Sequence, residues 1–368
     1  MSLTSQLHRG EVGRWCAVTF PGTSEAVRQV VAAAKSTGKG LVRPAGRPDG
    51  RHWADIGGAL GQRLADLVDP APPYGALLGM IRAGWLTFAQ AHAEAAAYPS
   101  HQEFDAEHRA RALSLRRTPD GWLDLGPTGD VRRADQAAGA ALRDLLARTR
   151  TYQATHTPVG QFGTNGAEAG LARSAWVISA CEGIYRSGEV DERLARVLRT
   201  GGRPEDLRVL PGEQAVTELV ELAWRARDTA LDEFRRLAGN PGPGVPLGVA
   251  APTFVPNWAD GDLLVGTGTE TLLVDVKTVM SVADPDKVSR WLWQILLYAW
   301  LDTDDLNHVR AAGLYLARHG ALITWGLDEL AGLLLDDTSA GHRKQVRREF
   351  EALAAKVITA EGGRFPIA

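Results

Sequence analysis

Residues 262–277 read DLLVGTGTETLLVDVK and carry the clearest structural signal in the chain. Two short apolar runs flank the segment GTGTE, which predicts two strands joined by a turn. On the second strand Asp275 and Lys277 are two residues apart, so their side chains emerge on the same face. Antiparallel pairing would bring Asp262, at the start of the first strand, close to Asp275. The stretch therefore predicts two carboxylates and one ammonium group at a common site.

This group of side chains suits a hard divalent cation. Mg²⁺ prefers oxygen ligands and is commonly held by one or two carboxylates together with phosphate oxygens of a substrate. A lysine beside such a cation can orient the attacking water and offset charge on the phosphate. Asp260 is an alternative to Asp262 as the upstream ligand, because residues two apart on a strand point to the same face. We prefer Asp262.

A long apolar helix is predicted after the hairpin. Asp284 and Pro285 suit its N-cap and first position, and the sequence WLWQILLYAWL is apolar on nearly every side. Arg290, Gln294 and Tyr298 are the exception, since their four-residue spacing places them on one face. Buried polar groups need partners, because an unsatisfied one costs about 1–3 kcal/mol. A metal site and a phosphate backbone would supply them.

The neighbouring segments complete a predicted α/β layer. Residues 213–237 have helical spacing, and an uncertain first strand lies around residues 245–255. Residues 309–325 alternate as a further hairpin that turns at His319 and Gly320. We therefore expect an α/β fold with a mixed central sheet flanked by helices.

The first half of the chain predicts mainly helices. Residues 15–43 read as strand, helix and strand, and residues 52–98 favour two or more helices. A hairpin is predicted around Pro119, followed by a helix over residues 134–150. A Pro- and Gly-containing segment at 200–213 has the character of a linker. We therefore divide the chain into residues 1–204, a mainly α-helical region with a β-hairpin and of unknown role, and residues 205–368.

Composition narrows the possible classes of protein. The chain has 368 residues, 45% of them hydrophobic, and contains no apolar run long enough to span a membrane or act as a signal peptide. We expect a cytoplasmic protein with no membrane partner. Its two cysteines are too few for a disulfide framework or a four-cysteine metal site. The net charge of −3 means that any contact with nucleic acid is local.

The ordered set D-x(12)-D-x-K and Q-x-x-x-Y resembles the PD-(D/E)XK nuclease superfamily, in its RecB-like branch. The likeness covers the C-terminal half only and implies a restriction-endonuclease-like core there. By position, Asp262 and Asp275 correspond to ligands of Mg²⁺ or Mn²⁺ and Lys277 to the catalytic lysine. Gln294 and Tyr298 correspond to residues that position the scissile strand. These five residues form the predicted catalytic set.

The sequence departs from the family pattern on the preceding helix. Family members often add a glutamate there, and Glu218 and Glu221 both qualify. We rank Glu218 slightly ahead as a third metal ligand. RecB-like members commonly carry a histidine on this helix as well, and residues 213–237 contain none. The iron–sulfur version of the family is excluded because its four cysteines are absent.

DNA is the expected partner, bound by the polar face of the apolar helix and by a basic cluster near the C-terminus. The residues predicted to bind nucleic acid are Arg290, Gln294, Tyr298, Arg343 and Lys344, and a second basic cluster comprises Arg109, Arg111, Arg116 and Arg117. The expected activity is that of a metal-dependent exonuclease or structure-selective nuclease in DNA repair or defence against phage. The alternative is a nuclease-fold scaffold that binds nucleic acid or a protein partner, with residues 1–204 as a possible partner platform.

Overall fold

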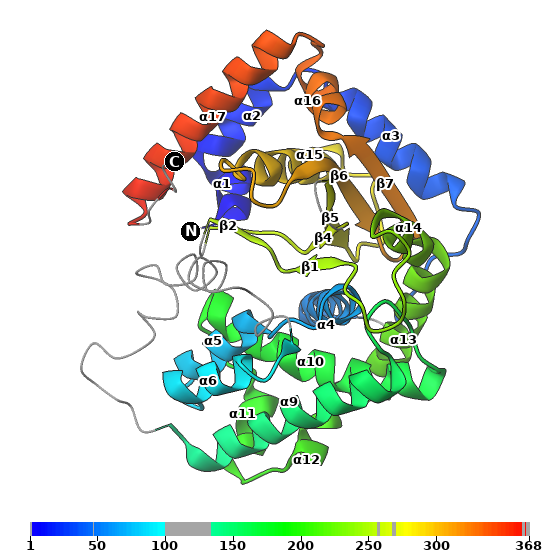
Figure 1. Ribbon diagram of the computed structural model, residues 1–368, viewed down its shortest axis with the longest axis vertical. Coiled ribbons are helices and arrows are strands. Elements are labelled where there is room, and N and C mark those ends of the chain that lie inside the picture. The colour runs from blue at the N-terminus through cyan, green and yellow to red at the C-terminus, as the bar shows by residue number, and fades with distance from the viewer. Residues whose placement is uncertain are drawn as a thin grey trace. The chain divides into compact units, whose positions relative to one another are not determined.

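The computed structural model describes residues 2–46, 48–99, 134–255, 258–266, 270–362 and 365. These residues form a mixed α/β structure with a largely helical N-terminal region (Figure 1). The predicted hairpin around Pro119 and the basic cluster from Arg109 to Arg117 lie outside the described ranges. Among the described helices, none is both long enough and apolar enough to cross a membrane.

Helices precede, connect and follow the strands. The helices are α1 (Leu3–Arg9), α2 (Glu11–Thr19), α3 (Thr23–Ser36), α4 (Gly50–Val68), α5 (Tyr74–Arg82), α6 (Phe88–Ala95), α9 (Gln136–His156), α10 (Asn165–Ser187), α11 (Glu192–Arg199), α12 (Pro204–Arg208), α13 (Gly212–Thr229), α14 (Leu231–Leu237), α15 (Pro285–Trp300), α16 (Leu327–Leu335) and α17 (Ala340–Ala360). The strands are β1 (Gly248–Ala250), β2 (Thr253–Val255), β3 (Ala259–Asp260), β4 (Leu263–Val265), β5 (Thr271–Lys277), β6 (Val309–Leu316) and β7 (Ala321–Gly326).

The main sheet has five strands in the order β1-β4-β5-β6-β7 and is mixed. β4 and β5 are antiparallel, with Leu263 opposite Val274, so the predicted hairpin is confirmed. β5 and β6 are parallel, and α15 makes the crossover that a parallel pair requires. β6 and β7 form the second predicted hairpin, closing with Leu316 opposite Ala321. A separate small sheet joins β2 and β3.

The chain folds into two compact units, each assembled from separate segments. Unit 1 contains Met1–Leu41, Asp228–Asn240 and Ala251–Ala368. Unit 2 contains Val42–Arg227 and Pro241–Ala250. The boundaries of these units differ from the single boundary that we predicted between residues 204 and 205. The first 41 residues belong with the C-terminal part, and α13 belongs with the central helices.

Unit 1 has a single apolar core that the N-terminal helices share with the C-terminal sheet. Leu3, Phe20 and Val30 lie in the same buried cluster as Leu292 and Ile295 of α15. The ribbon in Figure 1 shows α17, in red, packed along α2, in blue, while α3 contacts α15, α16 and β7. Since burial of apolar surface is the main stabilising term, these segments depend on one another for their fold.

Both strands predicted within residues 15–43 are wrong. No strand forms at residues 40–43, which follow α3. Residues 15–20, read as a strand, lie in the second half of α2 and at its end. Val12, Cys16 and Phe20 are buried at four-residue spacing, so one helical face enters the core. The apolar run WCAVTF had favoured a strand because a short apolar run alone does not distinguish the two structures.

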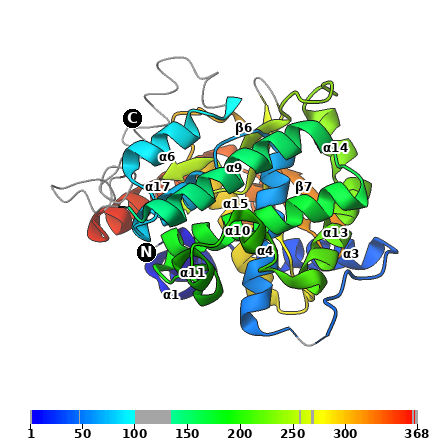
Figure 2. The same ribbon diagram turned by 90° about the horizontal axis from the view of Figure 1, so that it is seen from below.

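Unit 2 is built around α10, which packs against α5 (Figure 1) and against α4 and α9 (Figure 2). Arg63 of α4 and Glu168 of α10 form a buried ion pair, in which Arg63 Nε lies 2.8 Å from Glu168 Oε2. The helices predicted within residues 52–98 and 134–150 are confirmed as α4, α5, α6 and α9. The segment read as a linker at 200–213 contains α12.

Candidate active site

The two aspartates of the hairpin lie together at the ends of β4 and β5. The antiparallel register that pairs Leu263 with Val274 places Asp262 opposite Asp275. Asp262 Oδ2 accepts a hydrogen bond of 2.7 Å from the backbone N–H of Val276, which fixes the first carboxylate against the second strand. The Asp275 side chain is buried, with 4% of the residue exposed.

Lys277 extends from the same strand face as Asp275 and neutralises it. Its Nζ lies 2.7 Å from Asp275 Oδ2 and donates a 3.3 Å hydrogen bond to Gln294 Oε1. The same ammonium group lies 5.9 Å from the ring centroid of Trp291, within reach of a cation–π attraction. Lys277 is therefore held between the strand that carries it and helix α15.

The polar face of α15 finds most of its partners within unit 1. Gln294 Nε2 donates to the hydroxyl of Tyr298 at 2.9 Å and to Thr4 Oγ1 at 3.3 Å. Tyr298 stacks on Phe254, with ring centroids 5.8 Å apart. We had expected a metal site or a phosphate backbone to supply hydrogen-bond partners for the buried amide of Gln294. The protein itself supplies them. A connected chain of contacts runs from Asp275 through Lys277 and Gln294 to Tyr298.

Burial perturbs the acid–base behaviour of this group. It raises the pKa of Asp275 to about 6, the positive charge of Lys277 opposes that rise, and the negative charge of Asp262 adds to it. Burial also raises the pKa of Tyr298, with further contributions from Asp275 and Asp260. Tyr298 therefore remains a neutral hydroxyl at physiological pH. A positive ion near the two carboxylates would lower the pKa of Asp275.

The predicted third carboxylate is not part of this group. Glu218 of α13 belongs to unit 2, is buried, and has its Oε2 2.8 Å from Nε2 of His52. Glu221 is exposed on the same helix. Across the described ranges, no three His, Cys, Asp or Glu side chains lie close enough together to hold a metal ion. The structure thus brings two of the three predicted ligands together.

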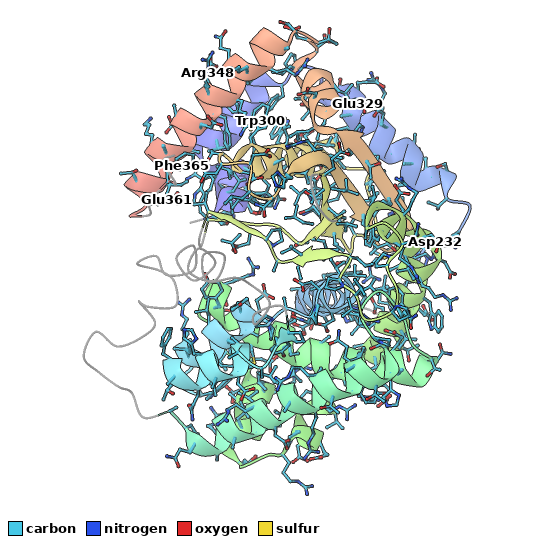
Figure 3. The ribbon with its side chains drawn as sticks, viewed as in Figure 1. Asp232, Trp300, Glu329, Arg348, Glu361 and Phe365 are labelled. Atoms are coloured by element: carbon cyan, nitrogen blue, oxygen red, sulfur yellow. The ribbon has the colours of Figure 1, made fainter. Side chains whose placement is uncertain are left out.

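The predicted nucleic-acid contacts are distributed over two helices. Arg290 lies one turn before Gln294 on α15, whereas Arg343 and Lys344 lie in the first turns of α17. Arg343 contacts Asp328, with Nε 3.6 Å from Oδ1, and donates to the carbonyl of Thr338. Lys344 is exposed, as is Arg348 one turn further along (Figure 3).

Two residues of the site were not anticipated. Thr4 of α1 hydrogen-bonds Gln294, and Phe254 of β2 stacks on Tyr298. No local pattern marks either residue, because their contacts join segments far apart in the chain. The competing aspartate, Asp260, lies in β3, where it is opposite Thr253.

No protein-family model matches the chain, and no curated protein or solved structure matches it either.

Proposed function

We propose that the chain is a metal-dependent DNA phosphodiesterase with a restriction-endonuclease-like core. One observation supports this most strongly: a buried carboxylate, Asp275, lies next to a second carboxylate and is in contact with Lys277, 2.7 Å away. Burying ionised groups is costly, and apolar side chains of similar volume would often stabilise a fold better. Their presence at the end of a hairpin, with a strongly perturbed pKa, is typical of a functional site.

The donor set fits Mg²⁺ or Mn²⁺. Asp262 and Asp275 would hold the cation, because two carboxylates with water and substrate phosphate oxygens are a common ligand set for Mg²⁺. The mutual repulsion that raises the pKa of Asp275 would be relieved by a cation between the two groups. When bound, the cation supplies Lewis-acid polarisation of the phosphodiester.

The protein side chains then have distinct roles. Lys277 offsets the negative charge that develops on the phosphate and orients the attacking water. Gln294 positions Lys277 through the hydrogen bond between its Oε1 and the ammonium group. Tyr298 and Thr4 hold the amide of Gln294 in turn. This division makes Lys277 the group that contacts the substrate and Gln294 a positioning residue.

DNA is the proposed substrate, and an exonuclease or structure-selective activity in DNA repair or phage defence is the proposed role. This part of the proposal rests on the likeness of the ordered D, D-x-K and Q-x-x-x-Y residues to RecB-like nucleases.

A second candidate is a scaffold that keeps this core and binds nucleic acid or a protein without cutting. The observation in its favour is that only two carboxylates gather at the site within the described residues, and one of them already contacts Lys277. In this case the region of residues 1–204 would supply the platform for a protein partner.

The deciding experiment measures cleavage of end-labelled single- and double-stranded DNA with Mg²⁺, Mn²⁺ or EDTA. We expect wild-type protein to cut only with a divalent cation. Asp275→Ala and Lys277→Ala should each lower the rate by roughly 10²-fold or more, since the first removes a ligand of the cation and the second removes the positive charge beside the reacting phosphate. Asp305→Asn is the matched control, because Asp305 is an exposed aspartate that pairs with Arg310 on the surface.

The outcomes separate the two candidates. Metal-dependent cutting that survives Asp305→Asn and is lost in both site variants supports the phosphodiesterase, and the product ladder gives its polarity. DNA binding by wild-type protein without cutting under any metal condition would favour the scaffold. Retained cutting by Asp275→Ala would place the active site elsewhere.

A further inference from the structure

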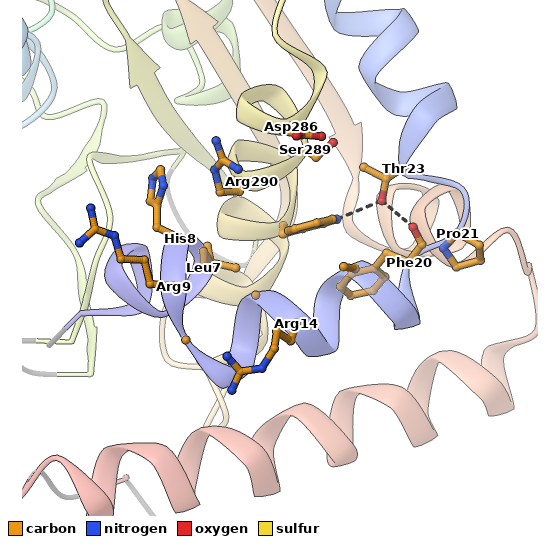
Figure 4. Close-up of a pocket in the computed structure, with 14 residues that line it drawn as sticks. Leu7, His8, Arg9, Arg14, Phe20, Pro21, Thr23, Asp286, Ser289 and Arg290 are labelled. Atoms are coloured by element: carbon orange, nitrogen blue, oxygen red, sulfur yellow. Dashed lines mark hydrogen bonds between the residues drawn. The ribbon is translucent and has the colours of Figure 1, made fainter.

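A cavity of about 640 Å³ lies in unit 1 beside the polar face of α15. α1, α2, the segment that leads from α2 into the start of α3, and α15 form its walls (Figure 4). Trp293 and Phe20 line its apolar side, where Trp293 Nε1 donates to Thr23 Oγ1 at 3.0 Å and Thr23 donates to the carbonyl of Phe20 at 2.7 Å. These bonds give the cavity a fixed wall, and its size lies within the range of small-molecule sites.

Cationic side chains predominate in the cavity lining. Arg9, Arg14 and Arg290 contribute three guanidinium groups, His8 adds an imidazole, and Asp286 is the one carboxylate among the lining residues. Arg9, Arg14 and Arg290 form no ion pair with any carboxylate in the part of the chain that the structure describes. An anion of matching size would therefore meet free guanidinium groups.

Arg290 is the most informative of these residues. Its Nε is buried and has no hydrogen-bond acceptor among the described residues. A buried donor without a partner costs about 1–3 kcal/mol, and a water molecule or a bound anion is a common way of satisfying one that the protein leaves unpaired. Among the buried arginine nitrogens of the described residues that lack a partner, that of Arg290 is the one that belongs to the lining of this cavity. The guanidinium plane offers paired N–H groups that suit the oxygens of a phosphate.

The positive charge extends from the cavity to the candidate active site. Partial burial lowers the pKa of His8, and the charges of Arg290, Arg9, Lys277 and Lys287 lower it further. His8 therefore lies within the field of Lys277 as well as that of the cavity arginines. In Figure 4 the side chains of His8, from α1, and Arg290, from α15, lie next to each other and extend in the same direction.

We propose that this cavity binds a backbone phosphate of the DNA strand next to the phosphodiester at the site of Asp262, Asp275 and Lys277. The proposal rests on the proposed function and specifies how its substrate is held. Arg290 and Gln294 are one turn apart on α15, about 6 Å along the helix axis. One or two nucleotides of a strand span such a distance. The strand would pass from Lys277 to Arg290, with His8 and Arg9 on the opposite side of the same phosphate.

Metal-free DNA binding tests this proposal without requiring cleavage. The affinity of the full-length protein for labelled single- and double-stranded oligonucleotides is measured in EDTA over a series of salt concentrations. Arg290→Gln and Arg9→Gln should each weaken binding about tenfold, as expected for a lost charge-assisted hydrogen bond. Each should also reduce the slope of log K against log salt by about 0.7–0.9. Arg28→Gln is the control, because Arg28 lies on α3 and already pairs with Glu25.

The charge can also be removed from the DNA instead of from the protein. Replacing one phosphate at a time by a neutral methylphosphonate should identify a position at which wild-type protein loses affinity and Arg290→Gln does not. Such non-additivity would show that the arginine and that phosphate contact each other. Thermal unfolding of each variant confirms that it is folded.

Four results are informative. Losses in Arg290→Gln and Arg9→Gln that are absent in Arg28→Gln, together with a non-additive phosphate position, support the subsite. Equal effects of Arg290→Gln and Arg28→Gln would overturn it, and so would failure of wild-type protein to bind either form of DNA. A non-additive phosphate without metal-dependent cleavage would retain the subsite while the proposed phosphodiesterase activity fails.

Discussion

Asp275 and Lys277 occupy one face of β5, and each compensates the charge of the other in a buried setting. The compensation is incomplete, because burial and Asp262 still raise the pKa of Asp275 to about 6. A further positive charge placed near Asp275 would stabilise its ionised form and lower its pKa. Under the proposed function, a divalent cation bound to Asp262 and Asp275 would supply this charge.

Asp66 of α4 offers a test of burial on a carboxylate remote from this chemistry. Burial raises its pKa to about 6, while Arg63 and a 2.8 Å hydrogen bond from Gln62 oppose the shift. Between about pH 4 and pH 6 the folded state then holds more protons than the unfolded state. The free energy of unfolding should therefore decrease as pH rises through this window. We expect Asp66→Asn to stabilise the protein at pH 7 by on the order of 1–3 kcal/mol and to change little near pH 4.

Urea unfolding between pH 2 and pH 7 measures this effect. Asp305→Asn should behave in the opposite sense, because its hydrogen bond with Arg310 lowers the pKa of Asp305 to about 2. The stability contributed by Asp305 is present above the pKa of the unfolded chain and is lost as pH falls toward 2. The same stability difference for Asp66→Asn at both ends of the range would show that Asp66 is not perturbed.

Between elements, a close approach of α5 and α10 organises unit 2. A Cβ atom added at Gly79 would lie 1.8 Å from the carbonyl oxygen of Cys181, which is backbone and cannot move aside easily. Helical periodicity predicts that helices form in this region, but it does not indicate that two backbones touch. The absence of a side chain at Gly79 is what permits this packing.

We expect Gly79→Ala to destabilise the protein by about 1–3 kcal/mol or more, because the added methyl group forces the two helices apart. Gly183→Ala is the matched control on α10, since a Cβ there meets no atom within 4 Å. This control should instead stabilise the helix by up to about 1 kcal/mol, the difference in helix propensity between the two residues. Urea denaturation of both variants gives the comparison, and a neutral Gly79→Ala would contradict the packing.

For the molecule as a whole, the N-terminal helices are part of the unit that carries the candidate site. Residues before Val42 bury apolar side chains in the core of unit 1. They also supply two hydrogen-bond acceptors: Thr23 accepts from the indole N–H of Trp293, and Gln29 accepts from that of Trp325. Thr4 also reaches Gln294 from this segment. The candidate site therefore depends on the start of the chain as much as on its C-terminal half.

A fragment of residues 205–368 should consequently fail to fold cooperatively, since it lacks α1, α2 and α3 and exposes their side of the core. Circular dichroism and thermal unfolding measure this. Adding a peptide of residues 1–41 should restore a cooperative transition, whereas a peptide carrying Phe20→Asp should not, because Phe20 is buried in the shared core. A cooperative transition of the fragment alone would show that the C-terminal part folds independently.

Local patterns were sufficient for the elements that carry the candidate chemistry. The pairing of β4 with β5, the N-cap at Asp284 and the hairpin of β6 and β7 are short-range features. Gly-containing turn segments between apolar runs predict the two hairpins, and the Asp-Pro pair predicts the N-cap. Strand parity and register then place Asp262, Asp275 and Lys277 near one another. These parts were predictable because their residues are neighbours in sequence.

Long-range contacts determined the rest. The run at residues 15–20 forms a helix because three side chains at four-residue spacing find an apolar core made by distant segments. Thr4 reaches Gln294, and Glu218 pairs with His52 rather than joining the two aspartates. Periodicity describes which face of a segment is apolar, but not which partner covers it. That choice is made by the packing of the whole chain, where burial outweighs local preference.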